Sequence, residues 1–178
     1  MTDLMISLRR SPRTLLERDG HPGPGAGKLG LVMARAGVGK TAFLTGIGVD
    51  ALLSGQKVLH ISIERTIDKV REWYDEALVE MLRQNKKLEH LSSLQLSMER
   101  NRHILVYNAE FFSLEKLEQS VAFLKDATGF APDMMILDGT PRFKTTEQWE
   151  IDGVRKLAGD TEAEIWTSAN PVSYTHLT

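Results

Sequence analysis

Short apolar runs alternate with segments of helical periodicity along most of this chain. In the segments between the runs, apolar residues recur every three or four positions, which is typical of amphipathic helices. The apolar runs predict strands at 29–34, 57–63, 103–108, 133–138 and 163–168. The periodic segments predict helices at 41–55, from 67 to about 92, at 113–129 and at 147–158.

The predicted strands are continuous apolar runs and do not alternate between apolar and polar residues. Such runs are expected where helices cover both faces of a parallel sheet, so each predicted strand, including 29–34, is expected to be buried. Strands and helices also follow one another in turn. The predicted fold class is therefore α/β, a three-layer sandwich with a mostly parallel sheet.

Residues at the ends of the periodic segments agree with helix boundaries. The predicted N-caps are Thr66 and Ser113, and the predicted stops are Gly55 and Gly129. The helix that begins at Ile67 is expected to break near Ser92 and Ser93.

The two ends of the chain differ in character from the middle. Residues 1–27 end in GHPGPGAG, where dense glycine and proline predict a lead-in and a loop. Residues 28–170 hold the alternating strands and helices. The last eight residues, PVSYTHLT at 171–178, follow neither pattern and resemble the translation of a sequencing-library adapter. We expect this tail to be non-native and the natural sequence to continue differently beyond Asn170; an ordinary C-terminal tail is the alternative.

The stretch ARAGVGKTAF at 34–43 lies between a predicted strand and a predicted helix. A loop at that place directs backbone N–H groups at a helix N-terminus, which favours a bound anion, above all phosphate. Gly37 and Gly39 allow a tight turn, Lys40 adds a charge toward the β and γ phosphates, and the Thr41 hydroxyl can bind magnesium. The stretch matches G-x-x-x-x-G-K-[ST] except at Ala34, which is tolerable there if its φ is negative.

This stretch, with the apolar run before it, resembles the P-loop of RecA-like ATPases, especially the KaiC and DnaB-helicase branch. The resemblance covers about residues 28–170 and implies a nucleotide-binding loop. The residues expected to contact the nucleotide are Arg35, Ala36, Gly37, Val38, Gly39, Lys40, Thr41 and Ala42. The resemblance also implies a ring or filament of identical subunits, in which the long helix from Ile67 is a candidate contact surface.

Two acidic residues follow predicted strands. The resemblance places the catalytic glutamate at Glu64, where a carboxylate can activate the attacking water; a surface acid opening a helix is the alternative. Asp138 ends the run MMILD, the pattern of a Walker B strand, and is expected to hold magnesium together with Thr41, although DGT is also good turn chemistry. Arg65 is expected to be a solvated or partner-facing charge.

Ser168 and Asn170 follow the last predicted strand, where related ATPases keep a polar residue that senses the γ phosphate. Ordinary loop polarity is an equally good explanation. Trp73 and Tyr74 are expected to pack in the core, because they share a helical spacing with Val70.

Composition narrows the function classes. The 178 residues carry a net charge of −2, so charge does not support nucleic-acid binding, although it does not exclude it. There is no cysteine, which excludes disulfides and thiolate metal sites, and the five histidines fall at no metal-ligand spacing. No window is apolar enough for a membrane span, and we expect a cytoplasmic protein without a membrane partner.

The sequence therefore predicts magnesium-dependent ATP binding and hydrolysis, with Lys40 and Glu64 in catalysis. A nucleotide-gated interaction module with little turnover is one alternative. A small-molecule kinase is a weaker one, because the segment 139–149 offers only Arg142 and Lys144 where an arginine-rich lid would be expected.

Overall fold

A computed structural model describes residues 12–17, 20, 23–63, 65–139 and 148–169 of the chain. Its strands are β1 (Leu29–Met33), β2 (Val58–Ile63), β3 (Arg102–Tyr107), β4 (Met134–Asp138) and β5 (Glu164–Ala169). Its helices are α1 (Pro12–Leu16), α2 (Lys40–Leu53), α3 (Ile67–Gln84), the 3₁₀ turn η1 (Leu88–His90), α4 (Leu91–Asn101), α5 (Leu114–Thr128) and α6 (Gln148–Thr161). The described strands form one sheet in the order β1-β5-β4-β2-β3, and every pairing is parallel. The predicted α/β class is confirmed.

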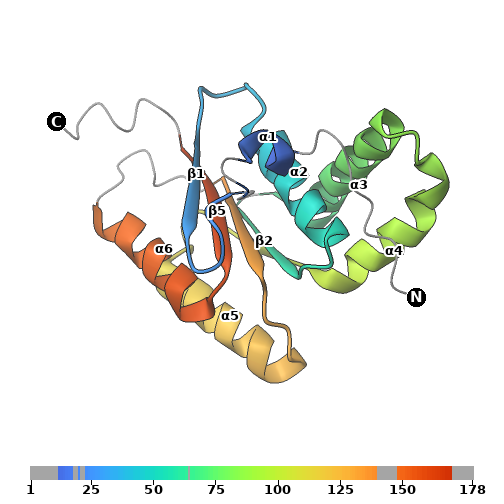
Figure 1. Cartoon of the computed structure of the whole chain (residues 1–178). Helices are drawn as coiled ribbons and strands as arrows, with labels where there is room; N and C mark the ends of the chain where they lie inside the picture. Colours follow the sequence, from blue (N-terminus) through green and yellow to red (C-terminus); the bar gives the residue numbers. More distant parts are fainter. Residues whose placement is uncertain (1–11, 18–19, 21–22, 64, 140–147, 170–178) are drawn as a thin grey trace.

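Helices cover both faces of the sheet, and each face has its own apolar core. On one face, α2, α3 and α4 pack on the sheet through residues such as Leu44, Leu78 and Met98. On the other face, α5 and α6 pack through residues such as Leu117 and Leu157. Figure 1 shows the sheet between these two groups of helices. In parallel strands that are covered on both sides, residues of either parity are buried, which explains the continuous apolar runs.

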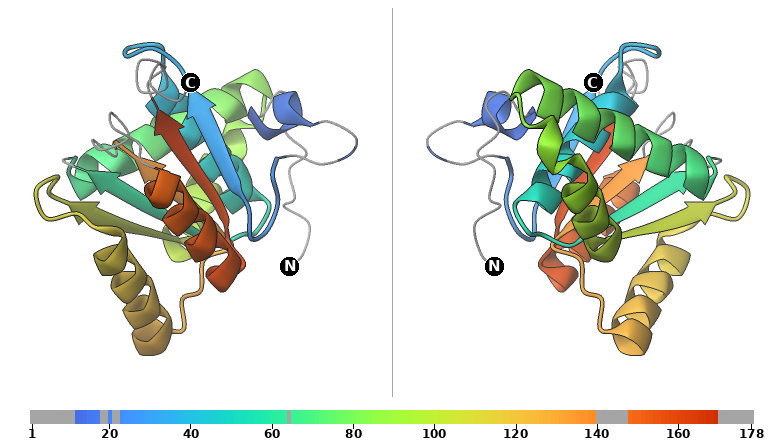
Figure 2. Two further views of the ribbon diagram at one scale, coloured as in Figure 1. Left: turned by 90° about the vertical axis from the view of Figure 1, so that its left-hand side faces the viewer. Right: turned by 90° about the vertical axis from the view of Figure 1, so that its right-hand side faces the viewer.

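Strand β1 is less buried than its sequence predicts. It lies at one edge of the described sheet, with β5 as its neighbour. Leu31 is 38% exposed and Met33 is 56% exposed. The prediction of a fully buried strand at 29–34 is wrong here because burial depends on a neighbour at each side, which the local sequence does not encode. In the left view of Figure 2, β1 and β5 lie side by side at this edge.

The long predicted helix breaks earlier than expected. Helix α3 ends at Gln84, and the side-chain amide of Asn85 then donates to the Met81 carbonyl at 2.8 Å. Lys86 follows in a left-handed conformation with φ of 55°. Ser93 lies in the first turn of α4, where its hydroxyl donates to the His90 carbonyl at 2.9 Å. The serines therefore start a helix and do not end one, because short hydroxyl side chains bond readily to backbone at a helix start.

The predicted caps agree with the structure. The hydroxyls of Thr66 and Ser113 accept the N–H groups of Lys69 and Lys116, both at 3.2 Å. Gly129 ends α5 in a left-handed conformation with φ of 70°. These local signals were readable because each acts within one helical turn.

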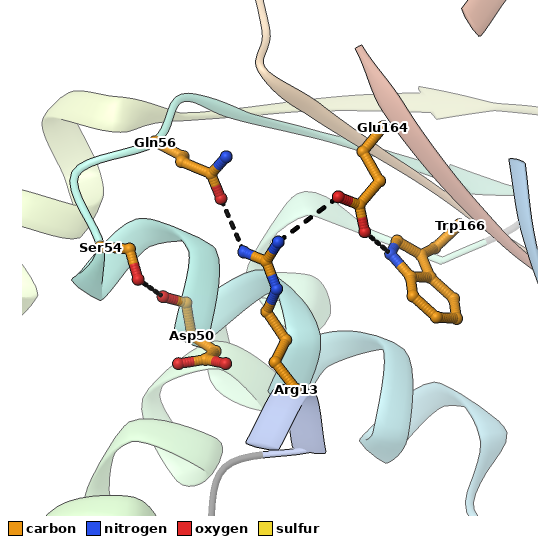
Figure 3. Close-up of polar contacts among 6 residues, drawn as sticks. All are labelled: Arg13, Asp50, Ser54, Gln56, Glu164 and Trp166. Carbon is orange, nitrogen blue, oxygen red and sulfur yellow. Dashed lines mark hydrogen bonds and ion pairs between the residues drawn. The ribbon is translucent and has the colours of Figure 1, made fainter. Parts of the chain in front are cut away.

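A short helix, α1, interrupts the segment predicted as lead-in and loop. Its Arg13 donates to the Gln56 side chain at 2.7 Å and forms an ion pair with Glu164 at 3.4 Å (Figure 3). The same glutamate accepts a hydrogen bond from the Trp166 indole at 2.6 Å. This buried network ties α1 to β5 and satisfies a carboxylate that would otherwise be costly to bury.

A second buried polar network lies between β2, β3 and α3. His60 is fully buried and its Nδ1 lies 3.1 Å from the Tyr74 hydroxyl. The Arg102 guanidinium lies 4.6 Å from the centre of the Tyr74 ring. Burial, with a smaller effect of the Arg102 charge, lowers the pKa of His60 from 6.5 to about 3. The imidazole is therefore neutral in the folded protein at neutral pH.

Acidification is expected to destabilise the protein through His60. The unfolded chain takes up a proton on this residue near pH 6.5, whereas the folded protein does so only near pH 3, so stability is present above pH 6.5 and is lost as the pH falls toward 3. Linkage gives a loss of about 2 kcal/mol between about pH 7.5 and pH 5. Urea unfolding of wild type and His60→Gln across this range measures the effect. Equal pH slopes for the two proteins would contradict it.

Candidate phosphate and metal site

The loop between β1 and α2 turns tightly through two glycines before the helix begins. Gly37 and Gly39 adopt left-handed conformations, with φ of 80° and 91°. Gly39 is the N-cap of α2, and its carbonyl accepts the first helical hydrogen bond, from Phe43 N–H at 2.9 Å. Ala34 is not in a positive-φ conformation, so alanine at this position causes no backbone strain. The loop therefore places two glycines with left-handed backbone at the N-terminus of α2, the positive end of the helix.

Lys40 lies at the start of α2 and folds back across the loop. Its ammonium donates to the carbonyls of Ala34 at 2.8 Å and Arg35 at 3.1 Å. These contacts hold the first and last parts of the loop together. They also keep a full positive charge next to the loop amides, where an anionic ligand would be attracted.

Asp138, the last residue of β4, lies beside Thr41 on the first turn of α2. Burial raises the pKa of the Asp138 carboxyl above its usual value. Hydrogen bonds from the Thr41 hydroxyl and the Gly139 N–H oppose that rise, as do the nearby charges of Arg65 and Lys40. The structure thus brings Thr41 close to Asp138, although the two residues are far apart in the sequence. The sequence predicts that they share one metal site.

The order of the strands explains how these parts meet. Strand β5 separates β1 from β4, and all three end at the same edge of the sheet because they are parallel. The segment after β1 leads to α2 on one face, while α6, which follows β4 in the chain, packs on the other face. Ligands of open α/β sheets bind at such points, where connections leave the strand ends to opposite faces.

The other predicted site residues are placed as follows. Arg35, Ala36, Val38 and Ala42 are exposed around the loop, and Val38 is 62% exposed. Ser168 lies near the end of β5 and is 8% exposed. Glu64 and Asn170 lie outside the described residues, so their predicted roles stay predictions.

Arg65 and Gly139 also lie near Asp138, and neither was among the residues that the sequence predicted for the site. Arg65 is exposed, as predicted, but its charge acts on Asp138. The N–H of Gly139 bonds to the Asp138 carboxylate. The signal for the second contact was the Asp-Gly pair after a buried strand, because glycine adopts the φ of 78° found here.

The residues present fit a magnesium ion that is bound together with a phosphate ligand. The Thr41 hydroxyl and the Asp138 carboxylate are hard oxygen donors, and they lie next to each other. Among the described residues there is no group of three histidine or acidic side chains that could hold a metal alone. Magnesium usually binds through one or two protein oxygens plus waters and substrate phosphates, so two ligands suffice.

In comparisons with known proteins, no family model and no curated protein matches the sequence. Among the helices that the structure describes, none has the length and apolar character needed to cross a bilayer.

Proposed function

We propose that this protein is a RecA-like P-loop ATPase that binds and hydrolyses magnesium ATP. One observation carries the proposal: Thr41, in the first turn of α2 beside the glycine loop, lies next to Asp138, an acid at the end of another parallel strand. A phosphate loop and a metal-holding acid in contact are the two parts that every magnesium-nucleotide site of this type needs.

Each part has a defined task in the proposed reaction. The loop amides and Lys40 hold the β and γ phosphates and stabilise the charge that develops during transfer. Thr41 and Asp138 are the residues that would hold magnesium, Thr41 through its hydroxyl and Asp138 through its carboxylate. The ion would supply positive charge that offsets the negative charge of the phosphates.

The proposed general base is Glu64, which follows Ile63, the last residue of β2, in the sequence. Strand β2 is the neighbour of β4, so Ser62 and Asp138 are register partners. This adjacency supports a role for the residue after β2 near the phosphate that is transferred. A carboxylate there would orient the attacking water and accept its proton.

Calorimetry with ATP, with and without Mg²⁺, tests the binding step, and phosphate release tests hydrolysis. We expect wild type to bind ATP in a magnesium-dependent way and to release phosphate, and Glu64→Gln to bind ATP but to release little phosphate. Tight binding with a turnover rate that Glu64→Gln leaves unchanged would favour the nucleotide-gated module. Transfer of the phosphoryl group to a small-molecule acceptor in preference to water would favour the kinase. Absence of magnesium-nucleotide binding would overturn all three.

The coupling of turnover to a partner is open to the same assay. The resemblance to KaiC and DnaB-type ATPases implies a homo-oligomeric ring or filament, and nucleic acid is a possible partner without support from the net charge of −2. Phosphate release measured with and without single-stranded DNA, beside the mass of the particle in solution, separates these possibilities.

A further inference from the structure

A buried serine lies next to Asp138 on the neighbouring strand. Ser62 of β2 is the register partner of Asp138 of β4. It is 1% exposed, and its hydroxyl has no hydrogen-bond partner among the described residues. A buried hydroxyl without a partner costs free energy, so its presence in a fully buried strand needs a reason.

The Ser62 side chain lies on the same face of the sheet as the candidate site. Residues two apart in a strand share a face, so Ser62 lies with His60, whose ring contacts Tyr74 of α3. Asp138 lies with Ile136, which belongs to the core formed by α2 and α3. Both side chains therefore point toward the helices that carry Thr41 and Tyr74.

Ser62 differs from the other buried hydroxyls without a hydrogen-bond partner because it is the register partner of Asp138. Thr45 and Thr167 also have buried hydroxyls without partners. Thr167 is paired with Leu137, which belongs to the core on the opposite face, so its hydroxyl lies away from Asp138. Only Ser62 among these three is in register with the carboxylate.

We propose that Ser62 is a positioning residue for Asp138, and that its hydroxyl donates to the second carboxylate oxygen when the magnesium-nucleotide site forms. This inference rests on the proposed function. Adjacent strands lie about 4.8 Å apart, so a serine that changes rotamer can reach a carboxylate on the same face. An ionised carboxylate accepts up to about four hydrogen bonds, so Asp138 has room for a further donor besides the nearby Thr41 and Gly139.

The consequence is a hydroxyl that has no partner among the described residues and would gain one when magnesium nucleotide binds. Asp138 is buried, with 6% of its surface exposed. A bound magnesium ion would require a charged carboxylate, and a third donor would fix the direction of that carboxylate. The Ser62 hydroxyl should then raise the magnesium-dependent affinity for nucleotide and should not raise the stability of the protein without nucleotide.

Ser62→Ala and Thr167→Val form a matched pair, because each removes one buried hydroxyl from a strand of the sheet. Ser62 lies on the face of the candidate site, and Thr167 lies on the opposite face. Binding of a fluorescent ATP analogue is titrated with Mg²⁺ and, separately, in EDTA, and each empty variant is melted. For Ser62→Ala we expect unchanged affinity in EDTA, a magnesium-dependent gain in affinity about tenfold smaller than in wild type, and a melting temperature no lower than that of wild type. Thr167→Val should match wild type in both titrations.

The outcomes separate this inference from the proposed function. A wild type that does not bind magnesium nucleotide overturns both. A wild type that binds, with Ser62→Ala showing the same magnesium dependence, overturns the role of Ser62 alone. A melting temperature of Ser62→Ala far below that of Thr167→Val would make the hydroxyl a structural group and also overturn it. Ser62→Cys, which keeps a side chain of similar size with a weaker donor, should fall between Ser62→Ala and wild type.

Discussion

Replacing Lys40 with alanine is expected to lower ATP hydrolysis by at least about 100-fold. The Lys40 ammonium is a full charge at the predicted phosphate loop, and it lies within 3.1 Å of two loop carbonyls. Alanine removes the charge that would stabilise the transferred phosphate while leaving the loop amides in place. Phosphate release at saturating ATP, with calorimetry for binding, measures the change.

Lys28→Ala is the matched control for this variant. Lys28 directly precedes β1 and is exposed, at the other end of the same strand from the loop. It should leave hydrolysis unchanged. Lys40→Arg replaces the compact ammonium with a planar guanidinium of the same charge. Compared with Lys40→Ala, we expect it to restore ATP binding more fully than the rate of hydrolysis. Full hydrolysis by a folded Lys40→Ala protein would contradict the role of Lys40 in the reaction.

Much of the fold was readable from the sequence because its signals are local. Apolar runs located the strands, and Thr66, Ser113 and Gly129 marked helix ends that the structure confirms. The tight turn at Gly37 and Gly39 was equally readable, since a glycine-rich loop between a strand and a helix is also a local signal.

The rest depends on contacts between distant segments. The order of the strands, which leaves β1 at an edge of the described sheet, decides that Met33 is 56% exposed, and no local pattern reports that order. The break after α3 was misplaced because a left-handed Lys86 carries no glycine signal. Ser62 was readable as a strand residue, but its place beside Asp138 follows only from the pairing of β2 with β4.

Asp138→Asn is expected to lower magnesium-dependent hydrolysis by at least about 100-fold without destabilising the empty protein. The asparagine amide keeps an oxygen that can accept from the Thr41 hydroxyl and the Gly139 N–H, the two contacts present in the empty site. It removes the negative charge that would hold the ion. Hydrolysis as a function of Mg²⁺ concentration, together with thermal melting without nucleotide, measures both effects.

The two effects of Asp138→Asn have one physical cause. Burial raises the pKa of Asp138, so the folded protein disfavours the charged carboxylate that the metal needs. A neutral side chain should therefore fit the empty site at least as well as aspartate, and the cost of the charge is recovered only when magnesium binds. Asp133→Asn is the matched control, because Asp133 is exposed just before β4, where its carboxylate accepts the Lys57 N–H at 2.7 Å. If Asp138→Asn kept the magnesium dependence of wild type, the ion would have to be held elsewhere. If instead it melted far below wild type, Asp138 would serve the fold and not the metal.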